Sequence, residues 1–530
     1  MTLPVELERV LSLPRRQPSS WEPPRRPYGD LQLRPVQAEA LGEIRAVGAG
    51  LVSAGVGHGK TLIGVLSGAA LDVERVVYLA PAACVKQVIR TVQHAAQTWV
   101  FPPVYVLSWS RMSLPLWEEE LTTAAGSGTF ALVCDEAHLL RGESARTRRW
   151  VRFRTENAAR SRVVLMSGTL TRRNLLDLVQ IAWVALGSRS PVPIGSTASA
   201  LAAYIEDPAM GRGHREAAAL RKWAGVDDTV AALGERVRSA PGVVSTASQA
   251  VDLPIYCSAI ESMPCAAPLL KLVDEVAATF RVPDGEDLIT AADVARVQRQ
   301  LALGYHLIWT WKNGPDREWI EARREWAAQV RRYIAANPDC DTELAVLWAV
   351  RHESTTPALV EAHRAWAAVN TDERAPIAKP HWHTTEVVDR LVDVAAQQRR
   401  CLLWYDEVAV VPLLKQLGVR VAPLGEAPTV ADGVTAVSIR SHATGLDLQA
   451  WSRNVLLTCP SAGATWEQLL GRTHRAGQMA DEVLVWRPAY CAVLNRAWRQ
   501  AQVDASYIAK VSGQVQKLQQ VEEVEYVVSF

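Results

Sequence analysis

The residues best suited to chemistry begin with a glycine-rich segment, Leu51–Ile63, which reads LVSAGVGHGKTLI between an apolar run and a helix-forming stretch. Its three glycines, whose small size lets backbone amides crowd around a polyphosphate, are Gly55, Gly57 and Gly59. Lys60 would reach the β- and γ-phosphates, and the Thr61 hydroxyl would bind Mg²⁺. The segment therefore predicts an ATP site, although Ala54 stands where the strict pattern has glycine.

A second group of reactive side chains ends another apolar run, in FALVCDEAH at Phe130–His138. A carboxylate at the carboxyl end of a strand, downstream of a phosphate loop, can hold the Mg²⁺, and we assign that role to Asp135. Glu136 is placed to orient or activate an attacking water. His138 follows two residues later, and the alternative of an ordinary loop histidine is weaker because the four letters DEAH occur together.

Two arginines form the third group, in TWEQLLGRTHRAGQ at residues 465–478. Helical spacing puts Gln468, Arg472 and Arg475 on one face. Both arginines could reach a polyphosphate, and one could stabilise charge during phosphoryl transfer. The alternative is a solvated amphipathic helix, which the upstream phosphate loop and DEAH segment disfavour.

Two sets of short apolar runs must position these residues. The first set is Gly50–Ala54, Val76–Ala80, Val104–Leu107, Phe130–Cys134 and Val163–Met166. The second set is Cys401–Tyr405, Val434–Ile439, Asn454–Thr458 and Glu482–Trp486. Buried strands that alternate with helices predict an α/β fold with parallel sheets.

The stretch between the two sets, from 190 to about 385, is expected to be mainly helical. Two helical faces stand out: Val294, Val297, Leu301 and Tyr305, and then Trp319, Trp326, Val330 and Tyr333. An extended piece is possible at Val251–Ser258. Residues 1–30 are rich in Pro and Arg and are expected to form an extended arm, either solvated or touching phosphate.

Composition limits the classes of protein to which the chain can belong. It has 530 residues, 49% of them hydrophobic and 21% charged, with a net charge of +1. These values exclude a polycation but allow a local basic surface. No apolar run is long enough to span a membrane, and no secretory signal is present. The eight cysteines are scattered without a CxxC pair, which disfavours a zinc ribbon or disulfide scaffold and predicts a cytoplasmic protein.

The ordered motifs resemble the superfamily 2 helicases and translocases, in which paired RecA-like lobes clamp ATP. LRPVQ at Leu33–Gln37 resembles the family's adenine-reading motif, with Gln37 as the reader. YLAPAA at Tyr78–Ala83 resembles a motif whose loop touches the nucleic-acid backbone. Ser167-Gly168-Thr169 resembles the motif that couples hydrolysis to strand movement, which implies coupling roles for Ser167, Thr169 and His138.

The arginine motif is most similar to that of the Swi/Snf-like branch. VLSWSR at Val106–Arg111, NLLDL at Asn174–Leu178 and TGLDL at Thr444–Leu448 resemble further motifs of this branch. The last of these implies coupling roles for Gly445 and Asp447. The chain departs from the branch pattern at Leu170, at Asp447 and in a short 406–439 segment.

The resemblance implies a complete architecture and function. The expected parts are the arm (1–30), a first RecA-like lobe (31–190), a helical insertion (191–385), a second RecA-like lobe (386–487) and a helical extension (488–530). The expected function is ATP- and Mg²⁺-dependent movement along duplex DNA, in a bacterial or phage setting, by a monomer that could work with replication, recombination or repair proteins. The expected nucleic-acid contacts are Lys86, Ser108, His442 and Thr444.

Two other functions stay open. A DEAH-type RNA helicase is disfavoured by the arginine motif. A nucleotide-switched scaffold without turnover is disfavoured because the predicted catalytic residues are present. The segment 141–162 carries eight arginines and two acidic residues, and could form a solvated helix or pair with phosphates.

Overall fold

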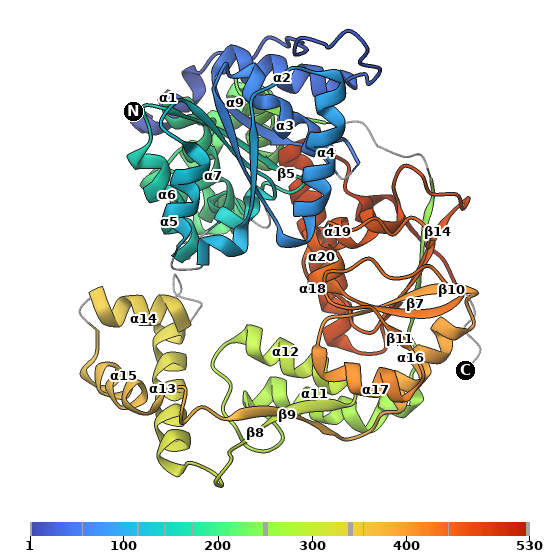
Figure 1. Ribbon diagram of the computed structural model, residues 1–530. Coiled ribbons are helices and arrows are strands. Elements are labelled where there is room, and N and C mark those ends of the chain that lie inside the picture. Colours follow the sequence, from blue (N-terminus) through green and yellow to red (C-terminus); the bar gives the residue numbers. More distant parts are fainter. Residues whose placement is uncertain are drawn as a thin grey trace.

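The computed structural model describes residues 3–55, 57–113, 116–141, 145–171, 174–246, 253–337, 343–352, 355–443 and 445–525. These residues form two parallel β-sheets covered by helices, and a helical subdomain that a two-stranded ribbon joins to the rest (Figure 1). The α/β class predicted from the sequence is confirmed.

The first sheet has six strands in the order β3-β2-β4-β5-β1-β6. Their bounds are β1 (Gly50–Ser53), β2 (Arg75–Ala80), β3 (Val104–Ser108), β4 (Phe130–Cys134), β5 (Ser161–Ser167) and β6 (Val243–Ser245). The four residues of β1 and the five of β4 are all buried, as expected for a sheet covered on both faces. Because all pairings are parallel, the loops after β1, β4 and β5 meet at one edge.

Helices cover both faces of this sheet and form two apolar cores. One face carries α2 (Pro35–Val47), α3 (Lys60–Ala70) and α4 (Val85–Thr98). The other face carries α5 (Trp117–Ala125), α6 (Ala145–Glu156), α7 (Leu176–Leu186), α8 (Gly195–Glu206), α9 (His214–Ala224) and α10 (Thr229–Arg238). We call residues 3–246 the first lobe. It runs past the predicted end at residue 190 because β6 pairs with β1.

The second sheet has seven strands in the order β11-β12-β10-β13-β14-β7-β15. Their bounds are β7 (Ile255–Ile260), β10 (Arg400–Tyr405), β11 (Arg420–Val421), β12 (Gly433–Ser438), β13 (Arg453–Leu456), β14 (Val483–Pro488) and β15 (Val521–Glu523). Its helices are α11 (Ala267–Thr279), α12 (Ala291–Ala302), α16 (Glu386–Ala396), α17 (Val411–Gln416), α18 (Ile439–His442), α19 (Gly463–Thr473) and α20 (Ala492–Ser512). We call residues 253–310 and 377–525 the second lobe. Its strand β7, which lies between β14 and β15, comes from the segment predicted to be a helical insertion, and β15 comes from the predicted extension.

The helical subdomain lies between the antiparallel strands β8 (Tyr305–Thr310) and β9 (Ile377–Trp382). It contains α13 (Arg317–Ala336), α14 (Glu343–His352) and α15 (Pro357–Val369), and Figure 1 shows it away from both sheets. The predicted helical face ending at Tyr305 is wrong at that residue, which begins β8. Gly304 explains the break, because its φ of +100° lies outside the helical region and an added Cβ would lie 2.1 Å from the carbonyl oxygen of Thr384.

Helix α20 belongs to the cores of both lobes. Trp498, Ala501 and Ala505 pack in the core of the second lobe, whereas Tyr507 and Val511 pack in a core of the first. In Figure 1 the helix runs between the two lobes. The two lobes are therefore joined by a single helix whose side chains pack in the core of each lobe.

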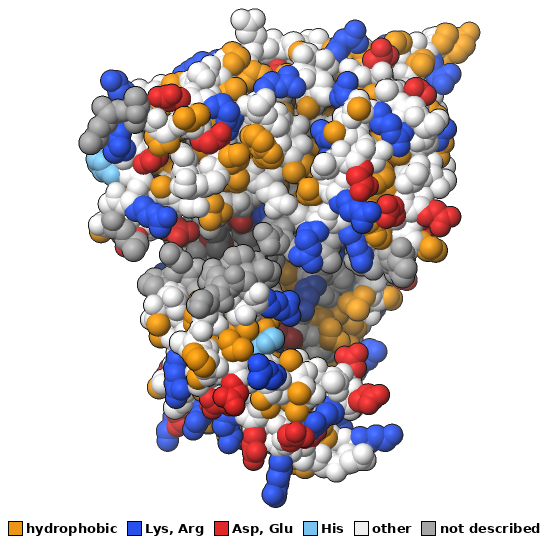
Figure 2. All heavy atoms as spheres, turned by 90° about the vertical axis from the view of Figure 1, so that its left-hand side faces the viewer, with side chains coloured by type: hydrophobic (Ala, Val, Ile, Leu, Met, Phe, Trp, Pro, Cys, Tyr) orange, Lys and Arg blue, Asp and Glu red, His pale blue; other side chains and the backbone are white. Residues whose placement is uncertain are grey.

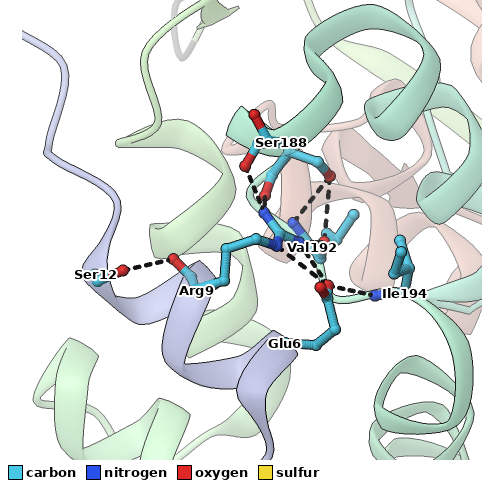
Figure 3. A network of polar contacts seen from close by, with 7 residues as sticks. Glu6, Arg9, Ser12, Ser188, Val192 and Ile194 are labelled. Carbon is cyan, nitrogen blue, oxygen red and sulfur yellow. Dashed lines mark hydrogen bonds and ion pairs between the residues drawn. The ribbon is translucent and has the colours of Figure 1, made fainter.

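The amino-terminal segment differs from the predicted extended arm. Residues Val5–Ser12 form α1, which buries Leu7 and Val10 against the first lobe. Arg9 fixes this helix by donating hydrogen bonds to the carbonyl oxygens of Ser188 at 2.8 Å and Val192 at 3.0 Å, while Glu6 pairs with Arg9 (Figure 3). Burial of the apolar face of this short helix outweighs the tendency of the flanking prolines to keep the segment extended.

On the face shown in Figure 2, basic and acidic side chains are interspersed over most of the surface, in keeping with the net charge of +1. Among the described residues, no helix is both long and apolar enough to cross a membrane.

Candidate nucleotide-binding site

A cavity of about 170 Å³ brings together residues from both lobes. The first lobe contributes the loop after β1, the start of α4 and the end of β4, and the second lobe contributes residues after α18 and around the end of α19. The predicted site residues that line it are Gly57, Gly59, Lys60, Thr61, Asp135, Glu136, Gly445, Arg472 and Arg475. Cys84, Gln87 and Val88 complete the lining.

The ammonium group of Lys60 is bound by two carbonyl oxygens at the start of the glycine loop. Lys60 Nζ donates to the carbonyl oxygens of Ala54 at 2.7 Å and Gly55 at 3.3 Å. Gly59 ends the loop with a φ of +76°, and an added Cβ would lie 2.2 Å from Gln37 Nε2. Only glycine fits this position without displacement, so the loop is built for close backbone approach.

Gln37 itself is buried beside this loop. Its Oε1 accepts a hydrogen bond from the backbone N–H of Arg34, and its Nε2 lies 3.4 Å from the carbonyl oxygens of His58 and Gly59. The side chain therefore connects the start of α2 to the glycine loop, which places the predicted adenine reader at the loop but outside the cavity lining.

Asp135 is held at the end of β4 by a side chain of the neighbouring strand β2 and by one that directly follows β3. Tyr78 Oη of β2 donates to its carboxylate at 3.3 Å, and Trp109 Nε1 donates to its carbonyl oxygen at 2.8 Å. Burial, and then the charge of Glu136, raise the pKa of the Asp135 carboxyl above its usual value. The carboxylate thus stands where a cation would relieve its desolvation.

Glu136 belongs to a network of polar side chains at the same edge. Its Oε2 lies 3.1 Å from His138 Nδ1 and 3.4 Å from Ser167 Oγ, and Ser167 Oγ also accepts from the backbone N–H of Thr169 at 3.1 Å. Burial alone would raise the pKa of Glu136, but the hydrogen bond and charge of His138, with Lys60 and Arg472, lower it. The three predicted coupling residues of the first lobe, His138, Ser167 and Thr169, therefore belong to the same polar network as Glu136.

The two arginines of the second lobe have different surroundings. Arg472 is buried and donates to the carbonyl oxygens of Gln468 at 3.2 Å and Leu446 at 3.1 Å. Burial, together with nearby Arg475, lowers the pKa of Arg472. Arg475 forms an ion pair with Asp447. Both arginines line the cavity, as does Lys60, so cationic residues of both lobes contribute to its lining.

The donor set fits a Mg²⁺ ion with a polyphosphate. Thr61 and Asp135 offer a hydroxyl and a carboxylate oxygen in the same cavity, and Mg²⁺ is usually held by one or two such ligands plus phosphate and water. No group of three or more His, Cys, Asp or Glu among the described residues could hold a metal ion alone. A site completed by phosphate oxygens agrees with both findings.

Some predicted residues lie elsewhere. Gln468 lines a separate cavity of about 300 Å³ with Arg299 and Arg440. Lys86 is exposed at the start of α4, and Ser108 is half-buried at the end of β3. The nucleic-acid contact predicted at His442 is wrong for its side chain, which is fully buried and accepts from the backbone N–H of Ser438 at 3.1 Å. Thr444 lies outside the described residues.

The structure adds residues that the sequence did not indicate. Tyr78 lies inside an apolar run, and only the order of β2 beside β4 reveals its contact with Asp135. Gln514, just after α20, donates to the Ser53 hydroxyl at 3.3 Å at the end of β1. The motif that begins at Tyr78 indicates no contact with Asp135, and Gln514 lies in no motif, so spacing alone could not have found these contacts.

Comparison with known proteins gives no family assignment. No protein-family model matches the chain, and no curated protein matches it.

Proposed function

We propose that this protein hydrolyses ATP, with Mg²⁺, in the cavity between its two lobes, and that it uses the cycle to move along DNA. In this proposal the two parallel sheets are RecA-like lobes of a Swi/Snf-like superfamily 2 translocase. The observation that carries the proposal is the single cavity lined by the glycine loop, both carboxylates and both arginines. Lys60 of the first lobe and Arg475 of the second, which both line the cavity, are about four hundred positions apart in the chain.

Each group has a role that its surroundings support. Lys60 would exchange the carbonyl oxygens of Ala54 and Gly55 for phosphate oxygens. Thr61 and Asp135 would hold Mg²⁺, which neutralises phosphate charge when bound. Glu136 would orient the attacking water, fixed by His138 and Ser167. Arg472 and Arg475 would stabilise the charge that develops during transfer, so turnover requires both lobes.

The same contacts suggest how turnover could move the lobes. Leu446 binds Arg472, and Asp447 binds Arg475, so the segment after α18 senses whether the arginines engage phosphate. In the first lobe Ser167 links Glu136 to the segment after β5. We propose that these two segments transmit nucleotide state to the nucleic-acid surface.

The test is ATP hydrolysis by the full chain, alone and with duplex DNA, single-stranded DNA or RNA. We expect stimulation by duplex DNA and a loss on the order of 10²-fold or more in Lys60→Ala, because the phosphate contact is lost. Lys271→Ala, an exposed lysine of α11, is the matched control and should retain full activity. Stimulation by RNA alone would instead favour an RNA helicase.

A lack of turnover would have a different meaning. The enzyme proposal would be wrong if the unsubstituted chain hydrolysed no ATP, alone or with any of the nucleic acids, and Lys60→Ala behaved identically. A nucleotide-switched scaffold would then replace it. Movement itself is tested by displacement of a third strand from a triplex.

A further inference from the structure

A larger cavity, of about 810 Å³, opens at the opposite edge of the first sheet. Its wall includes Ala49, just before β1, and Ser161 and Arg162, where β5 begins. The ends of α2, α6 and α7 complete it. The cavity therefore lies at the amino ends of the strands whose carboxyl ends carry the candidate nucleotide site.

The charge of this lining is one-sided. The charged residues that line the cavity are Arg45, Arg154, Arg162 and Arg189, and no acidic residue lines it. This contrasts with the mixed surface in Figure 2. Two of the four, Arg154 and Arg162, come from the arginine-rich segment whose role the sequence left open.

These arginines are poorly satisfied by the protein. Within the described part of the chain, Arg154 and Arg189 have no side-chain hydrogen bond or ion pair, and the Nε of Arg154 is buried without a partner. Arg162 donates to the carbonyl oxygen of Ser161 at 3.3 Å, and Arg45 lies over the ring of Trp21. None of the four is paired with a carboxylate. An unpaired buried donor costs free energy that a bound acceptor would recover.

Helix dipoles offset only part of this charge. Arg45 and Arg154 lie in the last turns of α2 and α6, and Arg189 follows α7, so the arginines face three helix C-termini. Each C-terminus carries about half a negative charge. The partial charges of the three C-termini therefore offset less than half of the positive charge of the four guanidinium groups. Capping of the helices therefore leaves the cavity positive.

We propose that this cavity binds the phosphate groups of a nucleotide or of a nucleic-acid strand. Guanidinium groups bind phosphate through charge-assisted and often bidentate hydrogen bonds. Trp183 also lines the cavity and is 38% exposed, with Arg9 5.7 Å from its ring centroid, so its remaining exposed surface could contact a base next to the phosphates. The proposal does not depend on ATP hydrolysis in the cleft.

The test measures binding in a Lys60→Ala background, which weakens phosphate binding in the cleft. One arm uses inorganic pyrophosphate in calorimetry, and the other uses a short fluorescein-labelled single-stranded oligonucleotide in anisotropy. We expect Arg154→Gln/Arg162→Gln to weaken at least one probe about tenfold, and to lower the salt dependence of oligonucleotide binding. The matched control is Arg152→Gln on the same helix, whose side chain pairs with Glu156 at the surface.

The arms separate the source of the phosphate. Loss confined to the oligonucleotide assigns the cavity to a nucleic-acid strand, and loss of pyrophosphate binding assigns it to a small phosphorylated ligand. The proposal is overturned if neither probe binds the Lys60→Ala protein, or if the double variant binds like the control. Should the double variant fail to fold, Arg189→Gln decides, because this exposed side chain has no protein partner among the described residues.

Discussion

At the scale of single residues, Gly59 links backbone geometry to the proposed chemistry. Its left-handed backbone disfavours any side chain, and an added Cβ would have to displace the amide of Gln37, 2.2 Å away. Gly48 has a nearly equal φ of +74°, but an added Cβ there would meet no atom within 4 Å. The two positions therefore separate backbone strain from steric blockage of the loop.

We expect Gly59→Ala to abolish ATP binding while the protein stays folded, because the methyl group would push Gln37 and the loop apart. Gly48→Ala should cost about 1–2 kcal/mol of stability and leave ATP binding unchanged. Equilibrium binding of a fluorescent ATP analogue and thermal unfolding check both expectations. Equal loss of binding in both variants would show that strain alone explains the effect.

Single residues also show which parts of the site the sequence could reveal. Lys60, Asp135 and Arg472 were predicted because each lies in a dense local pattern of residue types. The contact near His442 was expected because loops after core strands were the expected nucleic-acid contacts, yet the His442 ring is buried and bonds to Ser438 and Pro423. An expectation at the level of a loop does not show which side chains of that loop are exposed.

At the scale of elements, α1 shows how a short helix is held by one side chain. Arg9 bridges three backbone carbonyl oxygens and Glu6 (Figure 3). Its side chain is 19% exposed, so solvent screens the contacts only in part. Removing it would take one hydrogen bond from each carbonyl oxygen, although Val192 would keep its bond from Ser190 Oγ at 3.2 Å.

We expect Arg9→Ala to weaken the docking of α1 by about 1–3 kcal/mol and to speed proteolysis after residue 12, because three carbonyl oxygens each lose a hydrogen bond from Arg9. The control is Arg15→Ala, whose bond to Glu235 lies at the surface and should contribute about 0–1 kcal/mol. Limited proteolysis followed by mass spectrometry measures both. Identical cleavage rates would mean that Leu7 and Val10 suffice to hold the helix.

The segment after α20 is a second such element. Lys517 is buried, and its Nζ lies 2.9 Å from His474 Nδ1 while its backbone N–H donates to Glu467 at 2.6 Å. Burial raises the pKa of the Glu467 carboxyl, and the nearby charge of Lys517 opposes that shift. This segment thus supports α19, the helix that carries Arg472.

We expect Lys517→Met to destabilise the protein by about 3 kcal/mol, since it leaves Glu467 buried without its nearest cation. The double variant Lys517→Met/Glu467→Gln should regain part of that loss, because the uncompensated charge is gone. Thermal unfolding of the wild type, both single variants and the double variant gives the coupling free energy. Additive losses would rule out electrostatic coupling between the two residues.

Elements were predicted well where pattern and length agreed. The apolar runs at residues 76–80, 130–134 and 401–405 all became strands. Strand β8 was missed because the apolar spacing of α12 continues in phase into Tyr305, and only Gly304 marks the boundary. Strands as short as β6 and β15 carry too few residues for a period to be visible.

At the scale of the whole molecule, the lobes are assembled from distant parts of the chain. The domain limits expected from the sequence follow motif positions, but β6 and β7 lie between the motif-bearing segments and join different sheets. Long-range pairing of this kind leaves no local signal. The sequence could therefore predict two α/β units and several residues that line their shared cavity, but not which segments complete each sheet.

The helical subdomain gives a prediction at this scale. Thr310 pairs with Ile377, so the chain enters and leaves the subdomain at neighbouring points. We expect residues 311–376 to be replaceable by an Asn-Gly turn without unfolding the lobes. Trp309 and Ile289, which pack against the subdomain, would be changed to threonine in the same variant.

Circular dichroism and ATP hydrolysis of this deletion variant check the expectation. The full chain carrying only Trp309→Thr and Ile289→Thr is the control for the two substitutions. Soluble, folded protein with retained hydrolysis is expected, and an insoluble product from the deletion but not from the control would show that the lobes need the subdomain to fold.

The placement of β7 between β14 and β15 has a consequence for synthesis on the ribosome. Both neighbours of β7 are translated long after it, because β7 ends at residue 260 whereas β14 begins at 483 and β15 at 521. At about 5–20 residues per second, β7 waits on the order of ten seconds or more with both edges unpaired. The first lobe lacks this delay, since its six strands are complete by residue 245. Nascent chains should therefore acquire a folded first lobe while the second still depends on protection of one early strand.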